Sequence, residues 1–212
     1  MPRGATDHVA RLAEGARLRD PNTIATHRML GLNDGEFVAS AATLSIAAIR
    51  NQGGIEVTAE VRNVRAGHHL PTDSPLRQMI LTLEATDGEG NELELVQGGV
   101  LPDWAGSLAG SPGHVYAKVL RDLWSGEEPT GAYWRPVRVV RDTRIPAMSS
   151  HAATYQFATA GGSPVFVKAT LILRRAFEPL AKKKGWSDPD LVMHVKEIEV
   201  PVQIRRDGRI PG

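Results

Sequence analysis

The chain has 212 residues, of which 42% are hydrophobic and 23% are charged, and these values fit one folded domain with its own core plus a small appendage. The net charge is +1, from 25 basic and 24 acidic residues, so the bulk charge gives no support for nucleic acid or an anionic membrane as a partner. Cysteine is absent, which excludes disulfides, thiolate metal sites and covalent haem attachment through Cys-x-x-Cys-His within this chain.

Residues 1–34 are predicted to form an extended, partly helical N-terminal arm with little core of its own. One short helix is expected within residues 5–20, and Pro21 interrupts the pattern after it. Asn33 followed by Glu36 has the spacing of a capping box, which predicts a helical turn at about 34–42. The N-terminus has no apolar signal-peptide segment and no apolar run approaches the ~18 residues of a membrane span, so neither a signal peptide nor a transmembrane helix is expected.

From Thr43 onward the hydrophobic period changes to two, which indicates half-buried strands. Two hairpins are predicted, one turning at residues 51–54 and the other at residues 87–91. The inward positions of the first hairpin are expected to be Leu44, Ile46, Ala48, Ile55, Val57, Ala59 and Val61.

Residues 97–131 are rich in glycine and proline and are predicted to be irregular, with 115–124 either a strand or a short helix. The strongest strand pattern covers 164–175, a short helix is expected at 176–185, and a last strand at 196–204 carries Pro201, which favours a sheet edge. About seven to nine strands and few helices predict a mainly β fold, an antiparallel Ig-like β-sandwich over 35–207 with a tail at 208–212.

Two adjacent histidines, His68 and His69, stand between the two predicted hairpins in the stretch VRAGHHLPTDSPLRQ. Gly67 is expected to let the backbone turn sharply and Pro71 to stiffen the exit of the loop. Such a loop presents an imidazole, the commonest ligand of transition metals and haem iron. Two interpretations stand side by side: one histidine bonds the loop backbone while the other is exposed, or a histidine is a ligand.

The common catalytic motifs are absent from the sequence, so no enzymatic activity is predicted. Asp142 and Arg144 are expected to form a local salt bridge that holds a turn. Two alternatives use other residues: a protein- or glycan-binding module with loop tryptophans at Trp104, Trp124 and Trp134, and a mononuclear metal site that combines His68 and His69 with His114 or His151.

The stretch from Asn63 to Gly90 resembles the β-rich C-terminal domain of bacterial multihaem c-type cytochromes of the cytochrome c-552/c-554-like group. The matching positions in that stretch are Asn63, Ala66, Gly67, His68, Pro71, Thr72, Arg77, Asp87 and Gly90, with Asp73 in place of the family's glycine. A later segment that contains Asp142 and Arg144 is similar to the family's D-x-R-I-P-P, with Ala147 replacing the second proline. The resemblance spans about 20–204.

This resemblance implies a non-catalytic module or subunit of a multihaem cytochrome electron-transfer assembly, placed in the periplasm or outside the cell. It implies haem c held by a partner chain or a parent module, since this chain lacks the attachment cysteines. It makes His68, which holds the motif position, the first candidate for a distal axial ligand, with His27 in the arm and His69 as further candidates. No nucleic-acid partner is implied.

Overall fold

The computed structural model describes residues 30–72 and 74–202, so most of the predicted arm and the predicted tail lie outside the described residues. The chain divides into two compact units, Met1–Val38 and Ala39–Gly212. None of the described helices is long and apolar enough to cross a membrane. The helical elements are α1 (Gly35–Ala39), the 3-10 helix η3 (Asp103–Leu108) and α2 (Glu178–Lys184).

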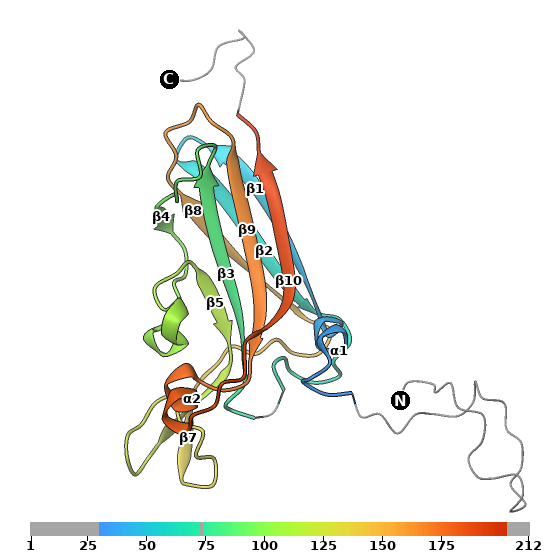
Figure 1. Ribbon diagram of the computed structural model, residues 1–212, viewed down its shortest axis with the longest axis vertical. Coiled ribbons are helices and arrows are strands. Elements are labelled where there is room, and N and C mark those ends of the chain that lie inside the picture. The colour runs from blue at the N-terminus through green and yellow to red at the C-terminus, as the bar shows by residue number, and fades with distance from the viewer. Residues whose placement is uncertain (1–29, 73, 203–212) are drawn as a thin grey trace, which may run out of the picture. The chain divides into compact units, whose positions relative to one another are not determined.

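The strands form two four-stranded antiparallel sheets that face each other, with a separate two-stranded hairpin (Figure 1). The order is β1-β2-β8-β4 in the first sheet and β10-β9-β3-β5 in the second, and β6 pairs with β7. The mainly β, antiparallel sandwich predicted from the sequence is thereby confirmed, while its Ig-like character stays a prediction. The strands are β1 (Ala42–Asn51), β2 (Gly54–Asn63), β3 (Gln78–Asp87), β4 (Leu95–Gln97), β5 (Gly113–Tyr116), β6 (Lys118–Asp122), β7 (Val137–Asp142), β8 (Ser150–Phe157), β9 (Val165–Arg174) and β10 (Leu191–Val200).

The main core lies between the two sheets and follows the period of two. Alternate residues of β2 and β9 are fully or almost fully buried, because successive side chains of a strand point to opposite faces. Each such buried Val, Ile or Leu stabilises the fold by about 1.5–3 kcal/mol. The predicted inward set of β2 is confirmed: Ile55, Val57, Ala59 and Val61 are all 0% exposed.

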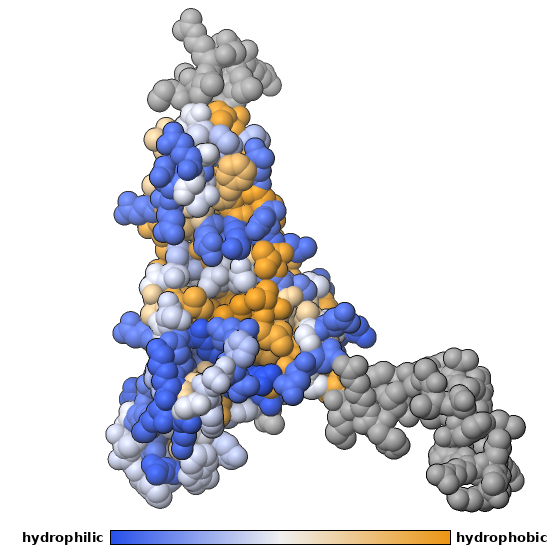
Figure 2. All heavy atoms as spheres, viewed as in Figure 1, coloured by the Kyte–Doolittle hydropathy of each residue, from blue (hydrophilic) through white to orange (hydrophobic). Residues whose placement is uncertain are grey.

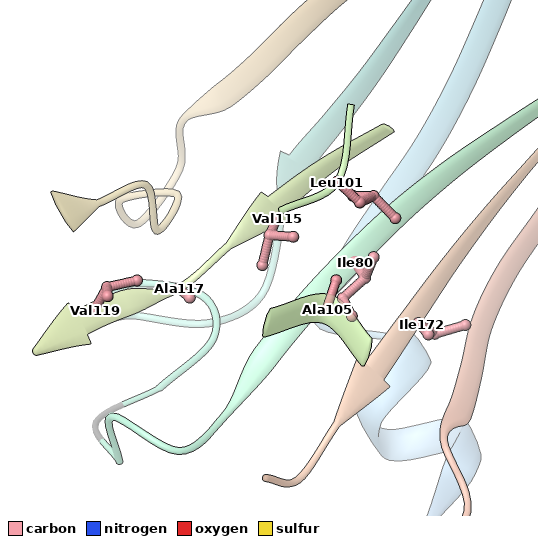
Figure 3. Close-up of a cluster of buried hydrophobic side chains, with 7 residues drawn as sticks. All are labelled: Ile80, Leu101, Ala105, Val115, Ala117, Val119 and Ile172. Atoms are coloured by element: carbon pink, nitrogen blue, oxygen red, sulfur yellow. The ribbon is translucent and has the colours of Figure 1, made fainter. Parts of the chain in front are cut away.

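A second apolar cluster covers part of the outer face of the β10-β9-β3-β5 sheet (Figure 3). Ile80 of β3 and Ile172 of β9 occupy outward positions and are buried there by the segment around η3. The members of this cluster are Ile80, Leu101, Ala105, Val115, Ala117, Val119 and Ile172. Residues 97–131 were predicted to be irregular apart from a strand or short helix at 115–124. The strand alternative is confirmed by β6, whereas η3 and the start of β5 at Gly113 were not predicted.

Arg174 at the end of β9 is 7% exposed and holds three elements around this second cluster. Its Nε and Nη2 donate to the two carboxylate oxygens of Asp190, at 2.9 and 2.7 Å. Its Nη1 donates to the backbone carbonyl of Ala105 in η3. Elsewhere on the same sheet the outer face is open, and Figure 2 shows an apolar patch on this side of the molecule. Phe166 of β9 and Val195 of β10 are exposed, at 44% and 45%.

Two sequence predictions differ in detail from the structure. The helical turn α1 is capped by Asp34 and not by Asn33, because Asp34 Oδ1 accepts the backbone N–H of Phe37 at 3.0 Å. The last strand is an edge strand that pairs with β9, as predicted, but it begins at Leu191, five residues before the predicted start. It ends at Val200, so Pro201 follows the strand and does not lie within it as expected. A bulge between Val192 and His194 interrupts the alternation of side chains. The first half of the strand therefore does not show the period of two from which strands were predicted.

Candidate functional site

The His68–His69 loop, which connects β2 to β3, is joined to the segment that follows β7. Leu70 and Ile145 form an isolated antiparallel bridge, with both N–H to O=C distances at 2.8 Å. The two segments that the sequence singled out are about 75 positions apart in the chain and meet at one end of the sandwich. His68 and His69 therefore share a surface with Asp142 and Arg144.

Asn63, the last residue of β2, fastens this junction from inside. Its side chain is 0% exposed, and its Nδ2 donates to the backbone carbonyls of His68 at 2.8 Å, Pro146 at 3.1 Å and Ile145 at 3.3 Å. Its Oδ1 accepts the backbone N–H of Ala66 at 3.1 Å. The sequence had a signal for this role, since Asn63 continues the inward alternation of β2 and a buried amide requires hydrogen-bond partners.

His68 has an exposed ring with one nitrogen already engaged. Its Nδ1 lies 2.9 Å from the backbone carbonyl oxygen of His69. A carbonyl accepts only, so Nδ1 is the donor in this contact and Nε2 is the ring nitrogen that could face a ligand partner. His69 is also exposed, and no hydrogen bond of its ring is found among the described residues.

Asp142 and Arg144 form a bidentate pair next to this loop. Arg144 Nε donates to Asp142 Oδ1 at 2.8 Å and Nη2 donates to Oδ2 at 2.6 Å. The Arg144 hydrogen bond is the chief reason that the pKa of Asp142 is lowered, and the charge of His69 acts in the same direction as a smaller cause. The ionised carboxylate thus holds the turn and lies within electrostatic reach of the loop.

The other predicted loop residues contribute less. Gly67 is outside the left-handed region and a Cβ built on it would meet nothing within 4 Å, so the turn does not depend on glycine there. Pro71 is buried after a cis Leu70–Pro71 peptide bond, whereas Thr72 and Arg77 are half-buried. His27 lies outside the described residues.

A second pair of histidines lies between the sheets. His114 of β5 pairs with Leu81 and His151 of β8 pairs with Val61, and paired residues of antiparallel strands point to the same face. Because Leu81 and Val61 are 0% exposed, both imidazoles face the interior. The rings stack with centroids 4.4 Å apart, and His151 Nδ1 lies 3.1 Å from the Tyr116 hydroxyl.

Both of these imidazoles are held neutral near pH 7. Burial, with smaller contributions from the charges of His151 and Arg141, lowers the pKa of His114 to about 4. Burial also lowers the pKa of His151. The pair borders an open pocket of about 270 Å³ lined by His114, Thr143, Arg144, Ile145, Pro146, Ser150 and His151. This cluster was not predicted, because neither histidine's sequence context reveals its cross-strand partner.

The combined histidine site that was considered from the sequence does not form as one group. His68 and His69 are exposed on the loop, while His114 and His151 stack between the sheets. Within residues 30–72 and 74–202, no three His, Cys, Asp or Glu side chains are grouped so as to hold a metal ion.

The three loop tryptophans separate into two kinds. Trp104 is half-buried against the second apolar cluster and meets Phe177 edge-to-face at a centroid distance of 5.7 Å, so it is a packing residue. Trp124 and Trp134 are 73% and 72% exposed in the connection between β6 and β7.

No protein-family model matches this chain, and no curated protein does either. Among solved structures it is similar to a penta-haem cytochrome c552 from Thermochromatium tepidum, with 20% identity and a TM-score of 0.65. The similarity covers 84% of this chain and 44% of that chain, so this chain spans less than half of that protein's length. A Northeast Structural Genomics Consortium target covers 74% of this chain with a TM-score of 0.28, which is too low to bear on the fold. The chain therefore shares its β fold with part of that cytochrome.

Proposed function

We propose that this chain is a non-catalytic β-sandwich module of a multihaem c-type cytochrome electron-transfer assembly, in the periplasm or outside the cell. It packs on haem modules and supplies a distal axial ligand from His68. The observation that carries the proposal is the His68 ring, whose Nδ1 is engaged by a backbone carbonyl while the ring is exposed. The likeness in fold to part of a penta-haem cytochrome supports the setting.

The chemistry of the ligand supports this choice of residue. Histidine ligands of haem iron and other metals usually donate one ring N–H to a carbonyl or carboxylate, which fixes the tautomer and the direction of the free nitrogen. The His68 loop is further held by Asn63 and by the Leu70–Ile145 bridge. A ligand positioned in this way loses little conformational entropy when it binds. The haem itself belongs to a partner or parent module, because this chain has no cysteine.

The first test is the visible spectrum of the protein isolated from its native host, with mass spectrometry of the polypeptides that co-purify. A Soret band together with a haem c polypeptide is the expected result. A colourless protein without such a partner contradicts the proposed assembly.

The ligand role is tested in the same complex with a matched pair of variants. His68→Gly is expected to remove one set of low-spin bands, and added imidazole is expected to restore them. His69→Gly is the control, since its exposed ring lacks the bond to a backbone carbonyl, and it is expected to leave the spectrum unchanged. Equal spectra for both variants, with the complex intact, would show that His68 is not a ligand.

A second candidate function is a module that binds a protein or a glycan, which the exposure of Trp124 and Trp134 favours. Aromatic side chains in such positions often anchor a partner. Quenching of tryptophan fluorescence by an oligosaccharide panel, lost in Trp134→Ala, would support this alternative over the cytochrome module.

A further inference from the structure

Four exposed apolar side chains gather in the connection between β6 and β7. We call Leu123, Trp124, Tyr133 and Trp134 the aromatic tip; their exposed fractions are 56%, 73%, 66% and 72%. Its three aromatic members are among the four most exposed large hydrophobic residues of the described chain. Figure 1 shows the β7 hairpin at the lower end of the ribbon, beside α2 and away from the upper ends of the long strands.

One buried carboxylate holds both halves of the aromatic tip. Asp122 is 0% exposed, and its Oδ1 accepts the backbone N–H of Trp124 at 2.8 Å while its Oδ2 accepts Arg135 Nη1 at 3.1 Å. These hydrogen bonds lower the pKa of Asp122, and the bond from the Trp124 N–H is the largest cause. The carboxylate therefore stays ionised. The backbone N–H of Leu123 also donates to the Pro136 carbonyl at 3.0 Å. The rings are therefore presented from a fixed backbone.

Basic side chains lie behind the aromatic tip on both strands of the hairpin. Lys118 and Arg121 are on β6, and Arg138 and Arg141 are on β7. Arg121 pairs with Glu128, whereas the other three form no salt bridge within the described part of the chain. Aromatic residues thus occupy the connection, where the exposed Glu127 and Glu128 also lie. The three basic side chains without a salt bridge follow along the strands.

We propose that the aromatic tip seats in the headgroup region of an anionic lipid bilayer. Trp and Tyr favour this region because each joins an apolar ring to a polar atom. Lys and Arg next to such a surface are attracted by its negative potential. Tyr133 and Trp134 meet edge-to-face, with their ring planes at 79°, so these two exposed rings pack against each other. This inference is independent of the cytochrome proposal.

The test is co-sedimentation of the full chain with vesicles of phosphatidylcholine alone and with vesicles that also contain phosphatidylglycerol. Binding is expected only to the second kind and is expected to weaken with added salt. The double variant Trp124→Ala/Trp134→Ala is expected to bind about a hundredfold more weakly. Loss of roughly 60 Å² of apolar contact from each ring, at ~25 cal/mol per Å², gives a factor of about ten per residue.

Two controls make the test specific. Trp186→Ala removes another exposed tryptophan, 48% exposed after α2, and is expected to leave vesicle binding unchanged. Arg138→Gln and Arg141→Gln are each expected to weaken binding about fivefold, since a basic residue near an anionic surface contributes about 1 kcal/mol, whereas Lys196→Gln on β10 is expected to have no effect. Melting temperatures verify that every variant is folded.

Three outcomes would overturn the proposal. The first is a wild-type chain that does not sediment with anionic vesicles. The second is equal vesicle binding by the double tryptophan variant and by Trp186→Ala. The third is that the aromatic tip instead mediates self-association or binding to a protein. Gel filtration without lipid would then show a change in mass, and the double variant would abolish that change.

Discussion

Replacing Asn63 with alanine tests whether one buried amide holds the His68 loop. The change removes four hydrogen bonds, three from Nδ2 to carbonyls and one to Oδ1 from Ala66 N–H. Each such bond contributes about 1 kcal/mol, and a buried group left unpaired costs about 1–3 kcal/mol. The carbonyls of Ile145 and Pro146 keep the backbone donors Leu70 and Ser149. We therefore expect a loss of about 3 kcal/mol in the free energy of unfolding.

The assay is urea denaturation, which gives the midpoint and the slope for each variant. Asn51→Ala is the matched control, because its Oδ1 accepts a single bond from Gly53 N–H at an exposed turn, and it is expected to cost less than about 1 kcal/mol. Asn63→Asp is expected to be worse than Asn63→Ala, since both lose the donor but Asp also buries an acceptor-only carboxylate against three carbonyl oxygens.

Hydrogen exchange gives a second measure that is specific to the loop. The amides of Leu70 and Ile145 donate to each other's carbonyls, and both are expected to exchange faster in Asn63→Ala than in the wild-type protein. The role of Asn63 would be refuted if Asn63→Ala lowered the free energy of unfolding no more than Asn51→Ala does and left hydrogen exchange at these two amides unchanged.

Three further predictions concern the interior. Unfolding raises the pKa of His114 from about 4 to 6.5, so the unfolded chain binds more protons than the folded chain between these pH values. The free energy of unfolding is expected to fall by about 2 kcal/mol as the pH is lowered through this window, which is less than the full linkage value because the site borders an open pocket. The melting temperature of His114→Leu should depend less on pH than that of the wild-type protein. Arg174→Met is expected to cost about 2 kcal/mol, because it leaves the buried Ala105 carbonyl without this donor and removes two bonds to Asp190, whose side chain is 32% exposed and stays solvated. A double-mutant cycle with Asp190→Asn checks this value. Tyr155→Phe is expected to be neutral or stabilising by up to about 1 kcal/mol in urea denaturation, since the Tyr155 hydroxyl is buried and has no hydrogen-bond partner among the described residues.

The long strands could be predicted because their signal is local. Along β2 and β9, alternate side chains must face either the core or solvent, so the order of apolar residues specifies which face is buried. The edge position of β10 was also predicted, although Pro201, on which that prediction rested, lies just after the strand. The stretch around His68 was also expected to lie between two hairpins, and it is the connection between β2 and β3.

Other features depend on contacts between residues that are distant in the chain. The polar and glycine-rich segment 97–131 folds over Ile80 and Ile172, and only this covering explains why two outward positions of the sheet are apolar. The stacking of His114 on His151 follows from the registers of β5 and β8 against different partner strands. A one-residue slip in either register would turn an imidazole to the other face.

The sequence by itself determined the class of fold, the inward faces of the strands and the loop that carries His68. Only the tertiary structure decided how that loop is held, because the partners of Asn63 are backbone carbonyls at positions 68, 145 and 146. It also decided that Trp104 packs inside while Trp124 and Trp134 stay exposed. The physical reason is that periodicity acts within one element, whereas burial and hydrogen bonding depend on which other element covers it.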